Sequence, residues 1–238
     1  MNYLQTDITY IIQKHLYKFY YNKKSSQEIS KIYRINKMFK YSIDDNRKYL
    51  KSLYFIPKTK QELQTAVDEW CDDKDRALLK YGNISLWITV NITDMSRLFY
   101  CKVNFNDCIK DWDTSSVTNM EGMFLCAKSF NQPLNNWDTS SVTKMNFMFY
   151  GADSFNQPLH NWDTSSVTDM RGMFCLATSF NQFLNNWNTS SVTNMYSMFY
   201  CASSFNQCLN NWDISSVTDM EFMFKNSNMS VLPSWYKN

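Results

Sequence analysis

The chain has 238 residues, of which 44% are hydrophobic and 17% are aromatic, and this composition excludes an intrinsically disordered protein. Only four glycines and four prolines are present, which excludes collagen-like and glycine-rich calcium-binding repeats. The net charge of +2 indicates no particular partner, but the charge is unevenly spread, since residues 1–60 hold 13 Lys and Arg against 4 Asp and Glu.

The basic segment 1–58 is predicted to form a head of helices, because Ile8, Ile12 and Leu16 recur at helical spacing. One interpretation is that this head contacts nucleic acid or a membrane surface. The other is a small helical domain with a solvated Lys and Arg face. The stretch TDITYIIQKHL is weakly similar to the first helix of an F-box, which would make the chain a substrate adaptor of a ubiquitin ligase.

Residues 59–86 are predicted to form a helical cap. Thr59 and Glu62 have the spacing of a capping box, and Gly82 is a typical helix stop. The apolar face of the helix would hold Leu63, Ala66, Val67 and Trp70. Because the first unit of a repeat array exposes apolar surface, we expect this helix to cover it.

Residues 87–224 contain a repeat of 25 residues, typified by WDTSSVTNM at 112–120. A weaker copy begins at Trp87, so about six coils are expected. The invariant aromatic columns are predicted to form the core: Trp112, Trp137, Trp162, Trp187, Trp212, Phe130, Phe155, Phe180 and Phe205. A single unit buries too little apolar surface to offset the entropy of ordering 25 residues, so the units must stack to fold.

Within one unit the spacing of the apolar residues changes. The stretch LNNWDTS at 134–140 alternates like a short strand, whereas Val142, Met145 and Phe149 lie on one face of a helix. Capping boxes at Thr118–Glu121 and Thr218–Glu221 favour the same helix. The expected fold class is therefore an α/β repeat in which each coil holds one strand and one helical turn. Residues 225–238 are expected to close the array.

The units, such as FNQPLNNWDTSSVTKMNFMF, resemble the BspA-like leucine-rich-repeat family, first catalogued as a mycoplasma protein of unknown function. The resemblance covers residues 87–224 and implies a right-handed leucine-rich-repeat solenoid that binds other macromolecules, often at a microbial surface. Arrays of this kind also occur in large DNA viruses. The resemblance therefore implies a non-enzymatic viral scaffold or protein-binding protein, with a virion structural component as an alternative.

The predicted binding surface is a polar strip on the strand face, for a protein or carbohydrate partner. Its residues are Asp113, Asp138, Asp163, Asn188 and Asp213, with Asp111, Asn136, Asn161, Asn186 and Asn211 two positions earlier. The alternative is local, because each Asp is followed two residues on by a serine, and its carboxylate can accept from the N–H of that serine, as in an Asx turn. The column that begins at Asn131 is interpreted as structural.

No catalytic residue, metal site or cofactor site is predicted. The serine pairs recur in every coil without a histidine in register, and the chain has only His15 and His160. The seven cysteines form no CxxC pair and are expected to be reduced thiols. Since neither a signal peptide nor a transmembrane segment is found, we expect the protein in the host cytoplasm or the virion.

Overall fold

The computed structural model describes residues 55–237, which belong to one compact unit, Ser52–Asn238. Residues 1–54 lie outside the described part. Three expectations therefore concern residues outside the described part. They are the helical head, its contact with nucleic acid or a membrane, and the F-box-like helix. Among the described residues, no helix is both long enough and apolar enough to cross a membrane.

Two α-helices precede the repeat, α4 (Lys60–Asp72) and α5 (Lys74–Tyr81), followed by the short 3-10 helix η1 (Ile84–Leu86). The hydroxyl of Thr59 accepts from the N–H of Glu62 at 3.2 Å, while the Glu62 carboxylate accepts from the N–H of Lys58 at 2.7 Å. The first bond satisfies an N–H group that the first turn of α4 leaves unpaired, and the second satisfies the N–H of the residue before the N-cap. At the end of α5, Gly82 takes φ 70°, a conformation that favours glycine.

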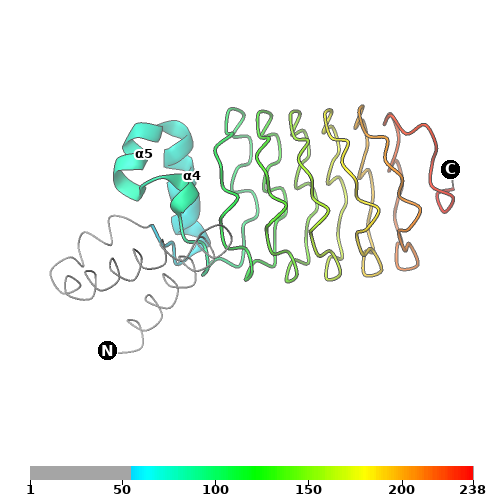
Figure 1. Ribbon diagram of the computed structural model, residues 1–238, viewed down its shortest axis with the longest axis horizontal. Helices are drawn as coiled ribbons and strands as arrows, with labels where there is room; N and C mark the ends of the chain where they lie inside the picture. The colour runs from blue at the N-terminus through cyan, green and yellow to red at the C-terminus, as the bar shows by residue number, and fades with distance from the viewer. Residues whose placement is uncertain (1–54, 238) are drawn as a thin grey trace, which may run out of the picture. The chain divides into compact units, whose positions relative to one another are not determined.

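The buried face of α4 consists of Leu63, Ala66, Val67 and Trp70. This helix packs at the N-terminal end of the repeat (Figure 1), where the indole N–H of Trp70 donates to the Asp107 carboxylate at 2.9 Å. The side-chain amide of Gln64 donates to the backbone carbonyl of Leu98 at 3.1 Å. The helix therefore covers the first coil with polar as well as apolar contacts.

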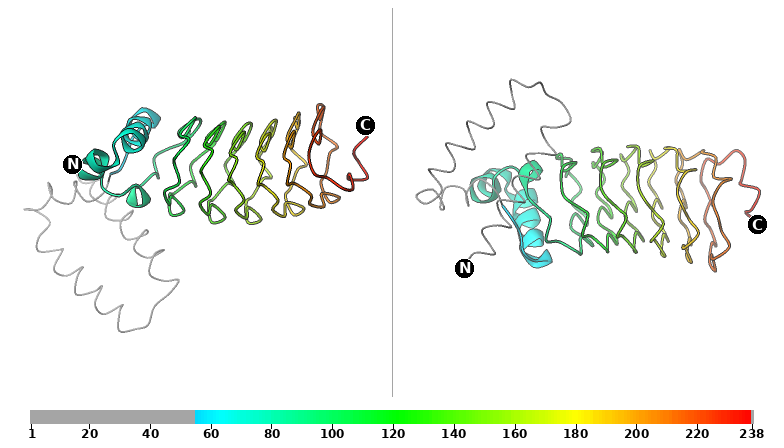
Figure 2. Two further views of the ribbon diagram at one scale, coloured as in Figure 1. Left: turned by 90° about the horizontal axis from the view of Figure 1, so that it is seen from above. Right: turned by 60° about the horizontal axis from the view of Figure 1, so that its bottom comes forward.

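The repeat forms a row of stacked coils, one for each 25-residue unit (Figures 1 and 2). The described coils contain no α-helix, and their only β-pairing is one isolated parallel bridge between each pair of neighbours, from Asp94–Asn119 to Asn194–Asp219. The expected α/β leucine-rich-repeat fold is therefore wrong, both for the strand at 134–140 and for the helix that follows it.

The segment expected to be helical is instead a run of turns, which we call the turn face. It comprises residues 94–101, 119–126, 144–151, 169–176, 194–201 and 219–226. Alternate N–H groups bond within the coil, as Met123 donates to Met120 O at 3.2 Å, and across coils, as Phe124 donates to Met148 O at 2.9 Å. In an α-helix every interior N–H would bond four residues back along the same chain. In the coils, alternate N–H groups of the turn face instead donate to carbonyl oxygens of the next coil, and these bonds link neighbouring coils.

Left-handed backbone conformations explain why no helix forms. Each coil has two residues with positive φ on the turn face, such as Gly122 at 55° and Cys126 at 57°. A left-handed residue every four positions is incompatible with a right-handed helix. The proposed capping boxes are also wrong, because Thr118 donates its hydroxyl to Thr93 O and the Glu121 N–H donates to Asn119 Oδ1.

The core consists of aromatic rings stacked from coil to coil. The rings of Phe124 and Phe149 lie 5.5 Å apart, and those of Trp162 and Trp187 lie 6.3 Å apart. The Trp and Phe residues assigned to the core from the sequence are all buried, with at most 4% of their surface exposed. The stacked rings thus form one continuous apolar core that runs through all coils. Units that are too small to fold alone are stabilised because they share this core.

The C-terminal end differs from the repeat in ways that stop the stack. A buried threonine in five coils, typified by Thr164, donates its hydroxyl to a carbonyl of the following coil, and Ile214 replaces it in the last one. Trp235 stacks on Trp212 at 6.5 Å and donates its indole N–H to Leu209 O at 3.0 Å. The tail therefore covers the tryptophan side of the last coil.

Candidate functional site

The predicted polar strip takes part in turns. Asp113, Asp138, Asp163, Asn188 and Asp213 each accept from the N–H of the serine two residues on, at 2.9 to 3.1 Å. These bonds lower the pKa of Asp163, chiefly through the Ser165 hydroxyl, and of Asp213, chiefly through the Ser215 N–H. The geometry is that of the Asx turn. These side chains are half-buried or exposed, and each has a structural task inside its own coil.

The second half of the strip is exposed in every described coil: Asp111, Asn136, Asn161, Asn186 and Asn211. It also makes contacts between coils, as the N–H of Asn161 donates to Asn135 Oδ1 at 3.0 Å and the side chain of Asn186 donates to His160 O at 2.6 Å. The Asn131 column has a similar role, because its Oδ1 accepts from the N–H of Asn156 at 3.0 Å. The strip is thus nearly the same in each coil and is bound into the stack.

The turn face has the opposite character. Its inward side chains, such as Met120, Met123 and Phe124, repeat in almost every coil and are buried. The side chains between them change from coil to coil: the column of Glu121 continues with Asn146, which is buried, and with Arg171, Tyr196 and Glu221, which are exposed. The columns of Asn119, Gly122, Leu125 and Cys126 vary in the same way. The stack therefore holds a fixed interior and presents a varied surface along this one face.

Aromatic residues are prominent on this surface. Tyr100 is 49% exposed, Phe222 is 43% exposed and Tyr196 is 37% exposed. Tyr196 and Phe222 belong to neighbouring coils and pack edge to face with ring centroids 5.8 Å apart. Exposed tyrosine and phenylalanine are typical of protein-binding surfaces, where they supply large contact areas at little entropic cost.

The charges on the turn face are mixed. Four basic and five acidic outward residues are present: Arg97, Lys144, Arg171, Lys225, Asp94, Glu121, Asp169, Asp219 and Glu221. Some pair with one another, as Arg97 does with Glu121 at 3.3 Å and Arg171 with Asp169 at 3.0 Å. A surface with both signs does not have the basic stripe that nucleic-acid binding requires.

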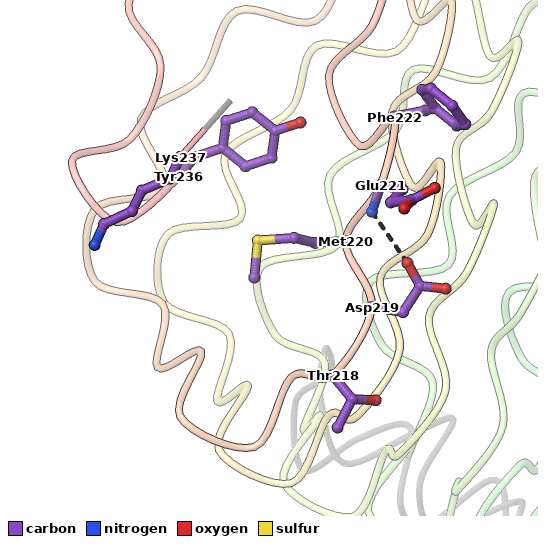
Figure 3. A pocket seen from close by; sticks show the side chains of 7 residues that line it. All are labelled: Thr218, Asp219, Met220, Glu221, Phe222, Tyr236 and Lys237. Carbon is purple, nitrogen blue, oxygen red and sulfur yellow. Dashed lines mark hydrogen bonds between the residues drawn. The ribbon is translucent and has the colours of Figure 1, made fainter.

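The turn face ends in a hollow of about 720 Å³ at the last coil (Figure 3). Thr218, Asp219, Met220, Glu221 and Phe222 line it from the coil, and Tyr236 and Lys237 line it from the C-terminal tail. Met220 extends between the two groups in the figure. Burial raises the pKa of Tyr236. The turn face is therefore open and concave at its C-terminal end.

Cysteines also gather on the turn face. Cys101 and Cys126 occupy the same column in neighbouring coils, and the N–H of Cys101 donates to Leu125 O at 2.8 Å. Burial, followed by the neighbouring Cys101, raises the pKa of Cys126. All cysteines of the described residues are free thiols. No group of three His, Cys, Asp or Glu side chains within residues 55–237 is arranged to hold a metal ion.

The sequence prediction placed binding on the polar strip and did not identify the turn face. The signal was nonetheless present, because the outward columns of 119–126 vary while the rest of the unit is nearly constant. The predicted helix would turn these positions to several sides of the coil, whereas the observed turns place them on one face.

Comparison with known proteins identifies a family. The family model described as "Mycoplasma protein of unknown function, DUF285" matches residues 65–174 and 156–235, which include α5, most of α4 and all coils. No curated protein and no solved structure matched the chain. The relation to the mycoplasma-type repeat family expected from the sequence is confirmed, and the chain belongs to the DUF285 family.

Proposed function

We propose that this chain is a non-enzymatic binding protein, in which the stacked coils are a scaffold and the turn face holds a protein partner. The observation that carries the proposal is the contrast on the turn face between constant inward residues and varied outward ones. A partner cannot tell one coil from another by residues that are identical in every coil. Residues that differ between coils allow it to bind at one position along the stack. Exposed aromatics such as Tyr100 and Tyr196 supply the contact area.

The mixed charges favour a protein over a nucleic acid as the partner. The polar strip is a weaker candidate for a protein or carbohydrate, because its carboxylates already hold the Asx turns. We expect the partner in the compartment that the sequence suggests, the host cytoplasm or the virion.

The test compares two variants with equal numbers of changes. The double variant Tyr100→Ser/Tyr196→Ser removes aromatic surface from the turn face, and Asn186→Ser/Asn211→Ser alters the polar strip. Each is immobilised and exposed to lysate of cells that produce the chain, and bound proteins are identified by cross-linking and mass spectrometry. We expect a partner that binds the wild type and the strip variant and is lost from the turn-face variant. The reverse pattern would place the site on the strip and contradict the proposal.

Two other functions stay predictions from the sequence. A ubiquitin-ligase adaptor would depend on the F-box-like stretch within residues 1–54, and recovery of ligase subunits through that segment would test it. A virion structural component would be found by mass spectrometry of purified particles.

A further inference from the structure

The last coil presents a row of backbone N–H groups that have no acceptor among the described residues. In the coil before it, Met195 donates to Asp219 O at 2.8 Å and Ser197 donates to Glu221 O at 2.9 Å. One coil later the corresponding donors are Met220, Phe222, Phe224 and Asn226, and none of these N–H groups donates within residues 55–237. An edge with unpaired backbone groups is a template for pairing with another chain.

The C-terminal tail leaves this edge open. Trp235 and Tyr236 cover the aromatic core, since the Tyr236 ring lies 5.0 Å from that of Phe224. They do not close the turn face at residues 218–222. The methionines equivalent to Met220 in the preceding coils are completely buried, whereas Met220 is only partly buried, beside the hollow (Figure 3). The hollow thus lies where a further coil would place its own methionine.

The opposite end of the stack is closed, which argues against a second copy as the occupant. The carbonyl of Leu98 on the first coil accepts from the Gln64 side chain of α4 at 3.1 Å. The Lys60 ammonium group also contacts Asp94 at 3.2 Å, and it contacts the Ser96 hydroxyl. Helix α4 therefore lies over the first coil and occupies Leu98 O, where the last coil of another molecule would have to dock.

The charges at the open edge indicate a basic partner. Asp219 and Glu221 lie on the coil side of the hollow, and among the described residues Lys237 is the only basic one that lines it. Within the stack, a basic side chain of one coil already pairs with a carboxylate of the next, as Arg97 does with Glu121. A Lys or Arg on a docked segment would pair with Glu221 across the same kind of boundary, with the carboxylate now on the earlier coil.

We propose that the open edge, residues 218–222, binds a peptide segment of a protein partner that lies parallel to the coil. Backbone carbonyls of the segment accept from the N–H groups of Met220 and Phe222. A Met or Leu side chain enters the hollow against Met220 and Tyr236, and a Lys or Arg side chain meets Asp219 and Glu221. This inference rests on the proposed protein-binding function and specifies where on the turn face a partner segment docks.

The test uses the full chain and a labelled synthetic peptide, TDMRGMFSLAT, which is the segment 168–178 with the change Cys175→Ser. In the stack this segment accepts through Asp169 O from Met145 N at 3.1 Å and through Arg171 O from Phe147 N at 2.9 Å. We expect saturable binding by fluorescence anisotropy, weakened about tenfold by Glu221→Lys because a favourable charge pair becomes repulsive. A peptide with Arg171→Glu should recover binding to that variant. Asp111→Lys, an equal charge reversal far from the edge in sequence, should leave binding unchanged.

Amide hydrogen exchange gives a second readout that depends on the hydrogen bonds themselves. The peptide should slow exchange at Met220 and Phe222, while Met195 and Ser197, which are bonded already, should not change. Equal binding to wild type and Glu221→Lys, or unchanged exchange at Met220 and Phe222, would overturn the edge site. Self-association that is abolished by Glu221→Lys would show that a second copy occupies the edge and would also overturn it.

The two proposals fail separately. If the turn-face variant Tyr100→Ser/Tyr196→Ser loses a captured partner but the peptide does not bind, the binding function stands and the edge site falls. If the peptide binds with the expected charge dependence but no partner depends on the turn-face tyrosines, the edge site stands without the wider surface.

Discussion

The indole N–H of Trp162 donates to the carbonyl oxygen of Leu134 at 2.9 Å, so the tryptophan of one coil is bonded to the coil before it. The same bond, between residues 28 positions apart, is made by Trp112, Trp137, Trp187 and Trp212. Each of these side chains therefore joins neighbouring coils by ring packing and by a hydrogen bond.

Replacement of Trp162 should weaken the middle of the stack. Trp162→Ala is expected to lower the free energy of unfolding by about 3–5 kcal/mol, because it leaves a cavity in the core. Trp162→Phe keeps a ring and loses the bond to Leu134, and should cost less. Since coils couple only to their neighbours, chemical denaturation of Trp162→Ala should show more than one transition. A single transition with unchanged midpoint would show that Trp162 does not join the coils.

Gly172 and Gly122 occupy the same left-handed column, with φ of 59° and 55°, but differ in their surroundings. A Cβ atom at Gly172 would lie 2.5 Å from Cδ1 of Phe147, whereas at Gly122 the nearest atom would be 3.5 Å away. Gly172→Ala should therefore lower the free energy of unfolding by about 2–4 kcal/mol, through backbone strain and overpacking together. Gly122→Ala should cost only the backbone strain, about 1–2 kcal/mol. Equal losses in thermal unfolding would contradict this difference.

The Asx turn at Asp163 should make stability depend on pH. Its carboxylate accepts from Ser165, and this lowers the pKa of Asp163 in the folded chain. The stabilisation is therefore complete above the unfolded pKa and is lost as the pH falls through the folded one. Asp163→Asn should keep the turn, as Asn188 does in the next coil, and should reduce the loss of stability between neutral and acid pH. Measuring urea midpoints at several pH values checks this, and an unchanged pH profile would count against it.

The cysteine column tests the arrangement of the coils. Cys101 and Cys126 occupy the same column of neighbouring coils, where Cys101 N donates to Leu125 O at 2.8 Å, so mild oxidation should link them. Cys108 and Cys208 lie four coils apart and should not form a bridge within one molecule. Burial raises the pKa of Cys175 to about 11, so this thiol should react slowly with alkylating reagents at neutral pH. Peptide mapping after oxidation gives the result, and a Cys108–Cys208 bridge in the folded monomer would be incompatible with the stack.

Several features followed from local sequence patterns. Thr59, Glu62 and the apolar face ending at Trp70 indicate α4, because capping and helical spacing act over a few residues. The 25-residue period identifies the aromatic columns, since a side chain that recurs in every unit is one that every coil buries. The alternative interpretation of the polar strip as Asx turns also depends on neighbours two residues apart, and the structure contains those turns.

The backbone conformation of the coil depends on residues far apart in the sequence. Apolar side chains three and four positions apart, as in Met120, Met123 and Phe124, point inward both from a helix and from a run of turns, so their spacing does not distinguish the two. The turns form because N–H groups such as that of Phe124 bond to the next coil, 24 residues away. The sequence by itself therefore determined the period and the interior. Only the stacking of coils decided that the varied columns share one face and that this face has an open edge, because the hydrogen bonds that create both join residues from different coils.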